Sequence, residues 1–169
     1  MSALAATLQV FFTDRLIRQR QASPDTIAAY RDTMRLLLAF AKQQTGKPPC
    51  KLELPDLDSV LIAAFLEYLE CERGNSVRTR NARLAAIHSL FHFASLRHPE
   101  HADIIARVLD IPAKRCDRSL VTFLTDVEVD ALLASPDRTT WTGRRDHALL
   151  LLAIQTGLRA SELTRLTCG

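Results

Sequence analysis

Arg159 and Glu162 stand three residues apart near the end of the 169-residue sequence, at the start of a short helix expected over 161–166. A guanidinium and a carboxylate at this spacing lie on the same side of a helical turn, so the glutamate could orient the arginine. An unpaired buried guanidinium is costly, and an arginine between apolar turns is therefore either paired internally or presented to an anion. Binding of an anionic group is the chemistry that this pair suggests.

A second candidate site is the start of a helix expected over 77–97, whose body is apolar and whose first two turns are basic. These turns combine three arginines with two other polar residues and no acid: Arg78, Thr79, Arg80, Asn81 and Arg83. Free backbone N–H groups and the helix dipole already favour anions at a helix N-terminus, so the added arginines predict a phosphate-binding site. The alternative is an ordinary solvated basic turn, which is common at helix ends.

Residues 111–119 interrupt all periodicity and carry several charges, which is typical of an interdomain connector. Their three cations, Lys114, Arg115 and Arg118, could follow the phosphate backbone of a nucleic acid. The alternative is a soluble linker that makes no such contact. Composition alone leaves both possibilities open.

Five helices are expected ahead of this connector, the first from its hydrophobic spacing and the others also from start or stop signals. The clearest follows Ser23 and Pro24, where serine is the N-cap and proline the first helical residue, and it ends at Gly46. Asp58 or the next serine caps the third helix, and Ser76 caps the fourth. The expected ranges are about 3–19, 24–45, 59–73, 77–97 and 100–109. The third helix should point Leu61, Ala64, Phe65, Tyr68 and Leu69 inward.

After the connector, Thr125 and Glu128 have the spacing of a capping box. In this motif the threonine side chain accepts the backbone N–H of the third helical residue, and the glutamate reaches back to the cap. A helix over 126–134 should follow, then a loop over 135–143, and then a helix from Arg144.

The last two expected helices meet at Gly157. Glycine adopts the left-handed conformation that closes a helix without a Cβ penalty, so the apolar run 148–154 should end there. Leu163 and Leu166 are three residues apart, which predicts that both lie on the inner face of the following helix.

Three segments in this order resemble the phage-integrase family of tyrosine recombinases, which are site-specific DNA recombinases. Residues 123–133 resemble the opening of the family's catalytic domain, and residues 145–150 resemble its next helix. Residues 156–163 resemble the block with its first catalytic arginine. Residues 76–84 are also similar to the helix of the family's core-binding domain that lies against the DNA.

This resemblance implies a mainly α fold with three parts. They are an N-terminal SAM-like core-binding bundle of four to five helices at 1–110, a linker at 111–120, and the first helices of an incomplete α/β catalytic domain at 121–169. In the family the linker spans the DNA between two domains.

The resemblance also implies roles in a reaction. Arg159 matches the first catalytic arginine, which contacts the scissile phosphate, and Glu162 matches the acidic residue that supports it. The family exchanges DNA strands without a metal or other cofactor, through a tyrosine that forms a phosphotyrosyl bond. Its lysine, its His-x-x-Arg pair and its tyrosine all belong beyond Gly169, while Tyr30 and Tyr68 fall on core stripes. We therefore expect double-stranded DNA as the partner and no catalysis by this chain alone.

Composition and scattered motifs exclude several other classes. Hydrophobic residues make up 47% of the chain, enough for a core, and a net charge of +3 permits a polyanionic partner without requiring one. The four cysteines include no Cys-x-x-Cys pair, which argues against a zinc ribbon or redox dithiol. His88 and His92 have a spacing that can bind a metal, but no acidic or cysteine ligand stands beside them, so we expect no metal site. No export signal or membrane span is recognised, which favours a cytoplasmic protein.

Two functional hypotheses remain. The first is a DNA-binding protein of the recombinase family, involved in DNA integration and site-specific recombination, whose bundle occupies DNA sites without cleaving them. The second is a helical protein-interaction module, a remnant that docks on an intact recombinase or folds back on itself. In both, residues 121–169 should form the less stable half, because they supply only three helices of a larger domain.

Overall fold

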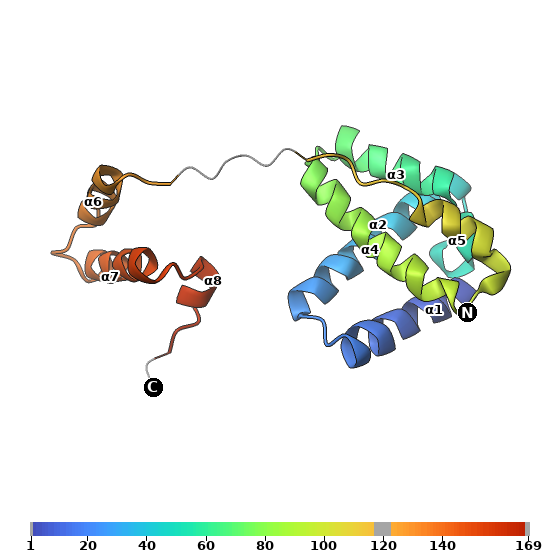
Figure 1. Ribbon diagram of the computed structural model, residues 1–169, viewed down its shortest axis with the longest axis horizontal. Coiled ribbons are helices and arrows are strands. Elements are labelled where there is room, and N and C mark those ends of the chain that lie inside the picture. Colours follow the sequence, from blue (N-terminus) through green and yellow to red (C-terminus); the bar gives the residue numbers. More distant parts are fainter. Residues whose placement is uncertain (1, 117–122, 168–169) are drawn as a thin grey trace. The chain divides into compact units, whose positions relative to one another are not determined.

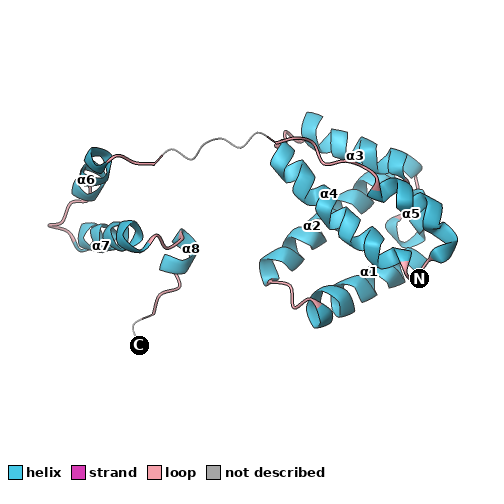
Figure 2. Ribbon diagram, in the orientation of Figure 1, coloured by secondary structure: helices cyan, strands magenta, loops and turns pink. Residues whose placement is uncertain are grey.

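Helices make up every regular element in the computed structural model, which describes residues 2–116 and 123–167. The chain divides into two compact units, Met1–Asp117 and Arg118–Gly169 (Figure 1). The described ranges contain no strand (Figure 2). The mainly α fold expected from the sequence is therefore confirmed.

The first helical run changes its winding halfway along. It begins as α1 (Ala3–Val10) and continues without a break as a π-helix, η1 (Phe11–Gln19). The single helix expected over 3–19 is thus continuous in the chain but not regular. The wider π turn brings residues five apart onto one side, and Phe11 and Leu16 are accordingly both buried.

α2 (Pro24–Thr45) has both ends where the sequence predicts them. The Ser23 hydroxyl accepts a hydrogen bond from the Thr26 N–H at 3.2 Å, and Pro24 occupies the first helical position. Gly46 closes the helix with a φ of 71°, in the left-handed region that favours glycine.

Two short 3₁₀ turns, η2 (Pro49–Lys51) and η3 (Leu54–Asp56), lead into α3 (Ser59–Cys71). Asp58 is its N-cap, with a carboxylate that accepts the backbone N–H three residues on at 2.8 Å. The buried residues of α3 are Ile62, Phe65, Leu66 and Leu69. Ala64, expected inward, is exposed because the buried face is rotated by about one residue from the expected stripe.

α4 (Val77–Ser95) is the central helix of the first unit and packs against α2, α3 and α5. The apolar body expected from the sequence faces the core, since Leu84, Ile87, Phe91 and Ala94 are all buried. The expected fifth helix consists of a 3₁₀ turn, η4 (Pro99–His101), followed by α5 (Ala102–Leu109).

One hydrophobic core holds these helices together, with aromatic rings at its centre. Phe11 and Phe91 are fully buried. Tyr30 stacks on Phe11 with ring centroids 6.4 Å apart, and Tyr68 lies against Phe40 at 5.1 Å. Both tyrosines therefore serve in packing, as their positions in the sequence predict.

The second unit contains α6 (Asp126–Ala134), α7 (Trp141–Thr156) and α8 (Ala160–Leu163). The predicted capping box at the start of α6 is confirmed. The Thr125 hydroxyl accepts from the Glu128 N–H at 3.4 Å, and the Glu128 carboxylate accepts from the Thr125 N–H at 2.8 Å.

α7 begins earlier than the sequence suggests and ends where expected. The helix starts at Trp141 instead of Arg144, because the Thr140 hydroxyl accepts from the Gly143 N–H at 3.0 Å and caps it. Gly157 closes the helix with a φ of 66°.

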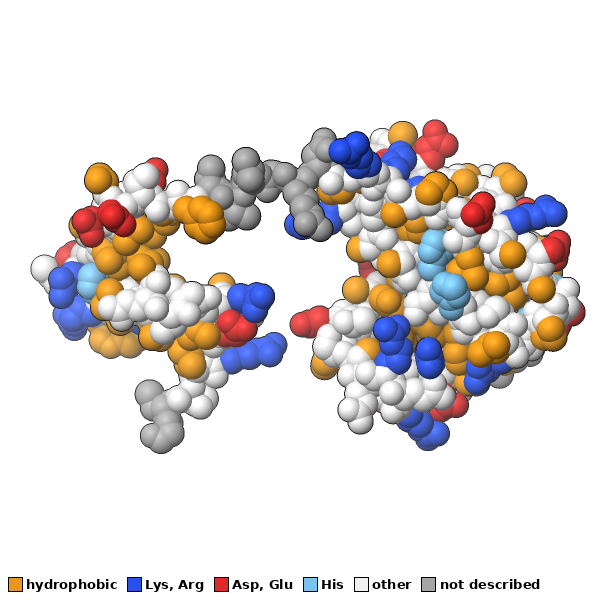
Figure 3. Space-filling view, viewed as in Figure 1, with side chains coloured by type: hydrophobic (Ala, Val, Ile, Leu, Met, Phe, Trp, Pro, Cys, Tyr) orange, Lys and Arg blue, Asp and Glu red, His pale blue; other side chains and the backbone are white. Residues whose placement is uncertain are grey.

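No hydrophobic side chain in the described part of the second unit is buried. Phe123 is 89% exposed and Trp141 is 67% exposed. Hydrophobic side chains accordingly appear on its surface in Figure 3. Over residues 123–167, the helices are held by caps and local packing and do not enclose a core.

Candidate functional site

The start of α4 presents an exposed arginine beside an exposed hydroxyl. The Ser76 hydroxyl accepts from the Thr79 N–H at 3.3 Å and lies 3.1 Å from the Thr79 hydroxyl. Arg78 is exposed and makes no ion pair with any residue in the described ranges. Its guanidinium is thus available to an anion at the positive end of the helix dipole.

Arg80 and Asn81 turn toward the chain's own connector. Arg80 is only 6% exposed and donates to the Pro112 carbonyl at 3.2 Å. The Asn81 amide donates to the Lys114 carbonyl at 2.7 Å and accepts the Lys114 N–H at 3.0 Å. Glu70 of α3 lies 2.6 Å from the Lys114 ammonium. This acid cannot be seen in the sequence around α4, because Glu70 belongs to α3 and is 44 residues away from Lys114 in the chain.

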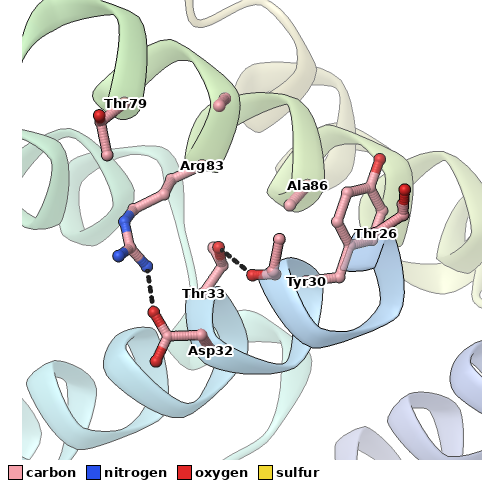
Figure 4. Close-up of a pocket in the computed structure, with 9 residues that line it drawn as sticks. Thr26, Tyr30, Asp32, Thr33, Thr79, Arg83 and Ala86 are labelled. Carbon is pink, nitrogen blue, oxygen red and sulfur yellow. Dashed lines mark hydrogen bonds and ion pairs between the residues drawn. The ribbon is translucent and has the colours of Figure 1, made fainter. Parts of the chain in front are cut away.

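Arg83 is held by α2. Its guanidinium donates to the Asp32 carboxylate at 3.0 Å (Figure 4), and Arg35 donates to the other oxygen of Asp32 at 2.9 Å. The hydrogen bond from Arg83 is the main reason why the pKa of Asp32 lies below its ordinary value. Two cations share one carboxylate here, so the local charge stays positive.

A cavity of about 320 Å³ lies between α2 and α4 beside this ion pair (Figure 4). We call it the α2–α4 groove, and its lining residues are Thr26, Ala29, Tyr30, Asp32, Thr33, Thr79, Ala82, Arg83 and Ala86. Alanine methyl groups form much of its wall, and hydroxyl groups and the ion pair supply the polar contacts. Such a surface can make both apolar and hydrogen-bonding contacts with a ligand.

The sequence motifs predicted the α4 side of this groove as a candidate site but not its α2 side. A second cavity of about 210 Å³ shares Thr26 and Tyr30 with it and adds Arg20, so the two adjoin along α2. The sequence contains a signal that relates the starts of α2 and α4, because Thr26 and Thr79 are each the third residue after a capping serine. In both turns the serine and threonine hydroxyls are in hydrogen-bond contact, at 2.9 and 3.1 Å.

The connector contributes two cations in the described ranges, Lys114 and Arg115. Both are exposed, but Lys114 is fixed by its contacts with α3 and α4. Arg118, the third predicted contact, lies outside the described residues.

Arg159 and Glu162 are paired as the sequence suggested. The Glu162 carboxylate accepts the Arg159 backbone N–H at 2.7 Å and lies 3.3 Å from its guanidinium. The Arg159 side chain remains 83% exposed. Leu163 is half-buried, but Leu166 is 56% exposed because α8 ends before it, so the prediction that both leucines face inward is wrong for Leu166.

The histidines of the first unit make structural contacts. His88 donates through Nε2 to the Val108 carbonyl at 3.1 Å, and burial lowers the pKa of the His88 imidazole. His98 lies 2.7 Å from the Thr7 hydroxyl and 3.1 Å from Glu100. Among the described residues, no three His, Cys, Asp or Glu side chains gather in a way that could hold a metal ion. Nor does any helix in these ranges have the length and apolar character that crossing a bilayer requires.

Comparison with known proteins places this chain beside DNA recombinases. Residues 10–98, which run from the last residue of α1 to just past the end of α4, match the family described as phage integrase, N-terminal SAM-like domain. The chain is 59% identical over 165 residues to integrase/recombinase y4rC of Sinorhizobium fredii, covering 98% of this chain and 50% of that relative. It is 47% identical over 161 residues to y4rD of the same organism, covering 95% and 57%.

Tyrosine recombinases of other bacteria are similar as well. XerD of Xanthomonas axonopodis pv. citri is 33% identical over 156 residues, covering 92% of this chain and 48% of that relative. The chain thus spans about half the length of the curated relatives it matches. No solved structure matches it.

Proposed function

The chain belongs to the phage integrase family of tyrosine recombinases, and on this basis we propose that it binds double-stranded DNA in DNA integration and site-specific recombination. In this proposal, residues 1–110 are the core-binding domain, 111–120 the linker and 121–169 the start of the catalytic domain. The protein works in the cytoplasm. The α2–α4 groove, which lies within the matched SAM-like region, is the observation that carries the proposal.

Three features in or next to this groove suit the backbone of DNA. The first turns of α2 and α4 both contribute to it, through Thr26 and Thr79, so threonine hydroxyls and the positive ends of two helix dipoles lie near its wall. Arg83 supplies a fixed guanidinium in the wall of the groove, and Arg78, next to Thr79 in the sequence but not part of the lining, supplies an exposed one. Phosphate contacts of this kind set the position and orientation of a protein on a duplex.

The remaining predicted contacts divide into two groups. Arg115 and Arg118 stay proposed phosphate contacts along the linker. Arg80, Asn81 and Lys114 have their polar groups engaged with one another and with Glu70, so we assign them a supporting role behind the DNA-facing surface.

Arg159 is proposed to contact the scissile phosphate, with Glu162 as its support. A fixed cationic donor stabilises the charge that develops on a phosphorane. The 169 residues alone are not expected to cleave DNA, because their two tyrosines, Tyr30 and Tyr68, lie on the hydrophobic core.

The test is binding of the full chain to a short random-sequence duplex, followed by fluorescence anisotropy over a range of salt concentrations. Arg78→Ala should weaken binding and reduce the slope of log K against log salt by about 1, as loss of one phosphate contact requires. Arg107→Ala is the matched control, because it removes the same charge from an exposed position on α5. An equal loss of affinity in both variants would mean that only the net charge of the protein matters, and it would overturn the assignment of the site.

A protein-interaction role is the second candidate, favoured by the exposed apolar side chains of the second unit. Phe123, Val127 and Trp141 are each more than half exposed. In this alternative the chain docks on an intact recombinase or on a second copy of itself. Absent or salt-insensitive DNA binding, together with self-association in analytical ultracentrifugation, would favour it over the first proposal.

A further inference from the structure

The connector that follows α5 does not leave the first unit at the end of that helix. Ile111 packs against the core, and the chain then runs back along α4 to the start of that helix (Figure 1). Residues 112–114 lie beside the first turn of α4, where they are held by polar contacts.

Asn81 makes the most specific of these contacts. Its side-chain amide donates to the Lys114 carbonyl at 2.7 Å and accepts the Lys114 N–H at 3.0 Å. Both backbone groups of one connector residue are therefore satisfied by one side chain, as a neighbouring strand would satisfy them. Arg80 adds a bond to the Pro112 carbonyl at 3.2 Å, two residues earlier in the connector.

Glu70 supplies a negative charge beside the Lys114 ammonium and the Arg80 guanidinium. Its carboxylate lies 2.6 Å from the Lys114 ammonium and 4.0 Å from the Arg80 guanidinium, and its side chain is 17% exposed. Arg80 is almost completely buried, and a buried cation is stable only beside an opposite charge or suitable acceptors. The carboxylate from α3 supplies the opposite charge, and the connector carbonyl accepts a hydrogen bond from Nη1 of Arg80, whereas its Nε has no hydrogen-bond partner among the described residues.

We propose that Glu70, Arg80 and Asn81 form a clamp on connector residues 112–114 and so fix the point at which the chain leaves the first unit. These three are positioning residues, because they act on the path of the connector. Opening the clamp would free residues 112–114 and lengthen the tether to the second unit by roughly 10 Å. When one unit is bound to its partner, a shorter tether raises the effective concentration of the other unit at its own binding site.

The test is hydrogen exchange of the full chain, because the Lys114 N–H is itself one of the clamp's bonds. Asn81→Ala should accelerate exchange of the Lys114 amide by about tenfold, as loss of a hydrogen bond implies, while core amides of α4 keep their rates. Trypsin cleavage of the Lys114–Arg115 bond should accelerate in parallel. An unchanged rate at Lys114 would overturn the proposal.

A second variant decides the result if Asn81→Ala loosens the whole unit. Glu70→Gln keeps the shape of the side chain and removes its charge, and Glu72→Gln makes the same change at an exposed position two residues on. Faster exchange and cleavage at Lys114 in Glu70→Gln alone supports the clamp. Equal behaviour of the two variants overturns it. No readout involves DNA, so the result is independent of the proposed function.

Discussion

The two units of this chain use the same helix signals but differ in what their helices bury. Ser76 caps α4 and Thr125 caps α6 in the same way, and Gly46 and Gly157 close α2 and α7 with nearly equal φ values of 71° and 66°. Every buried hydrophobic residue that the structure describes nevertheless lies between positions 4 and 108. Local signals thus define helices in both units, whereas only the first unit has an interior.

The two candidate sites differ for the same reason in how firmly their side chains are held. The α2–α4 groove is built on helices anchored in a core, so its ion pair is held on both sides. Arg159 stands beside α8, a single turn of helix whose stability depends on its caps. We therefore expect the first site to keep its geometry in solution and the second to move more freely.

The largest effect should come from matched core truncations. Phe91→Ala removes a fully buried ring from α4 and should destabilise the first unit by about 3–5 kcal/mol. Leu149→Ala removes a side chain of α7 that is 40% exposed and should cost the second unit less than about 1 kcal/mol. Hydrogen exchange at increasing urea concentration, resolved by peptide for each unit, measures both. Similar losses would mean that the second unit has a core of comparable strength.

Matched glycine substitutions should give an intermediate effect. Gly46→Ala and Gly157→Ala each place a Cβ in open space at a left-handed φ, so each carries only the conformational cost of about 1 kcal/mol. In the first unit this cost should lower the urea midpoint of the whole bundle. In the second it should appear only as faster amide exchange over the last turn of α7. A shift of the whole second unit by Gly157→Ala would show that it unfolds cooperatively.

The smallest effect should be a pH dependence confined to the first unit. The folded pKa of His88 lies below its unfolded value of about 6.5, so the unfolded chain binds the proton more readily. Stability should therefore fall as pH drops below about 6.5, by less than about 1 kcal/mol because the ring is partly exposed. His88→Gln, which can still donate to the Val108 carbonyl, should remove this component in urea titrations at pH 7 and pH 5. An unaltered pH profile in His88→Gln would assign the effect to other groups.

Features that depend on a few adjacent residues could be predicted from the sequence. The caps at Ser23, Asp58, Ser76 and Thr125 involve bonds across three residues, and all four are present. The early start of α7 escaped prediction because glycine disfavours helices. Gly143 is nevertheless suited to this position, since a Cβ there would overlap the Asp137 carbonyl.

Features that depend on distant residues could not be predicted in this way. Arg83 meets Asp32 across 51 positions of sequence, and Arg80 meets Pro112 across 32. Only the packing of α4 against α2 and the return of the connector bring these groups together. The basic character of the α4 start could therefore be seen in the sequence, whereas the division into exposed Arg78 and engaged Arg80 required the fold.

The pairing of Arg159 with Glu162 has a consequence for the entropy of anion capture. The short bond to the Arg159 N–H fixes the backbone at this residue, while the guanidinium keeps one 3.3 Å contact and stays 83% exposed. The direction in which the side chain leaves the helix is thus set, but most of its rotamers remain accessible. Immobilising such a side chain costs up to about 2 kcal/mol. A phosphate that binds Arg159 must supply this free energy itself, unless further protein contacts restrict the side chain beforehand.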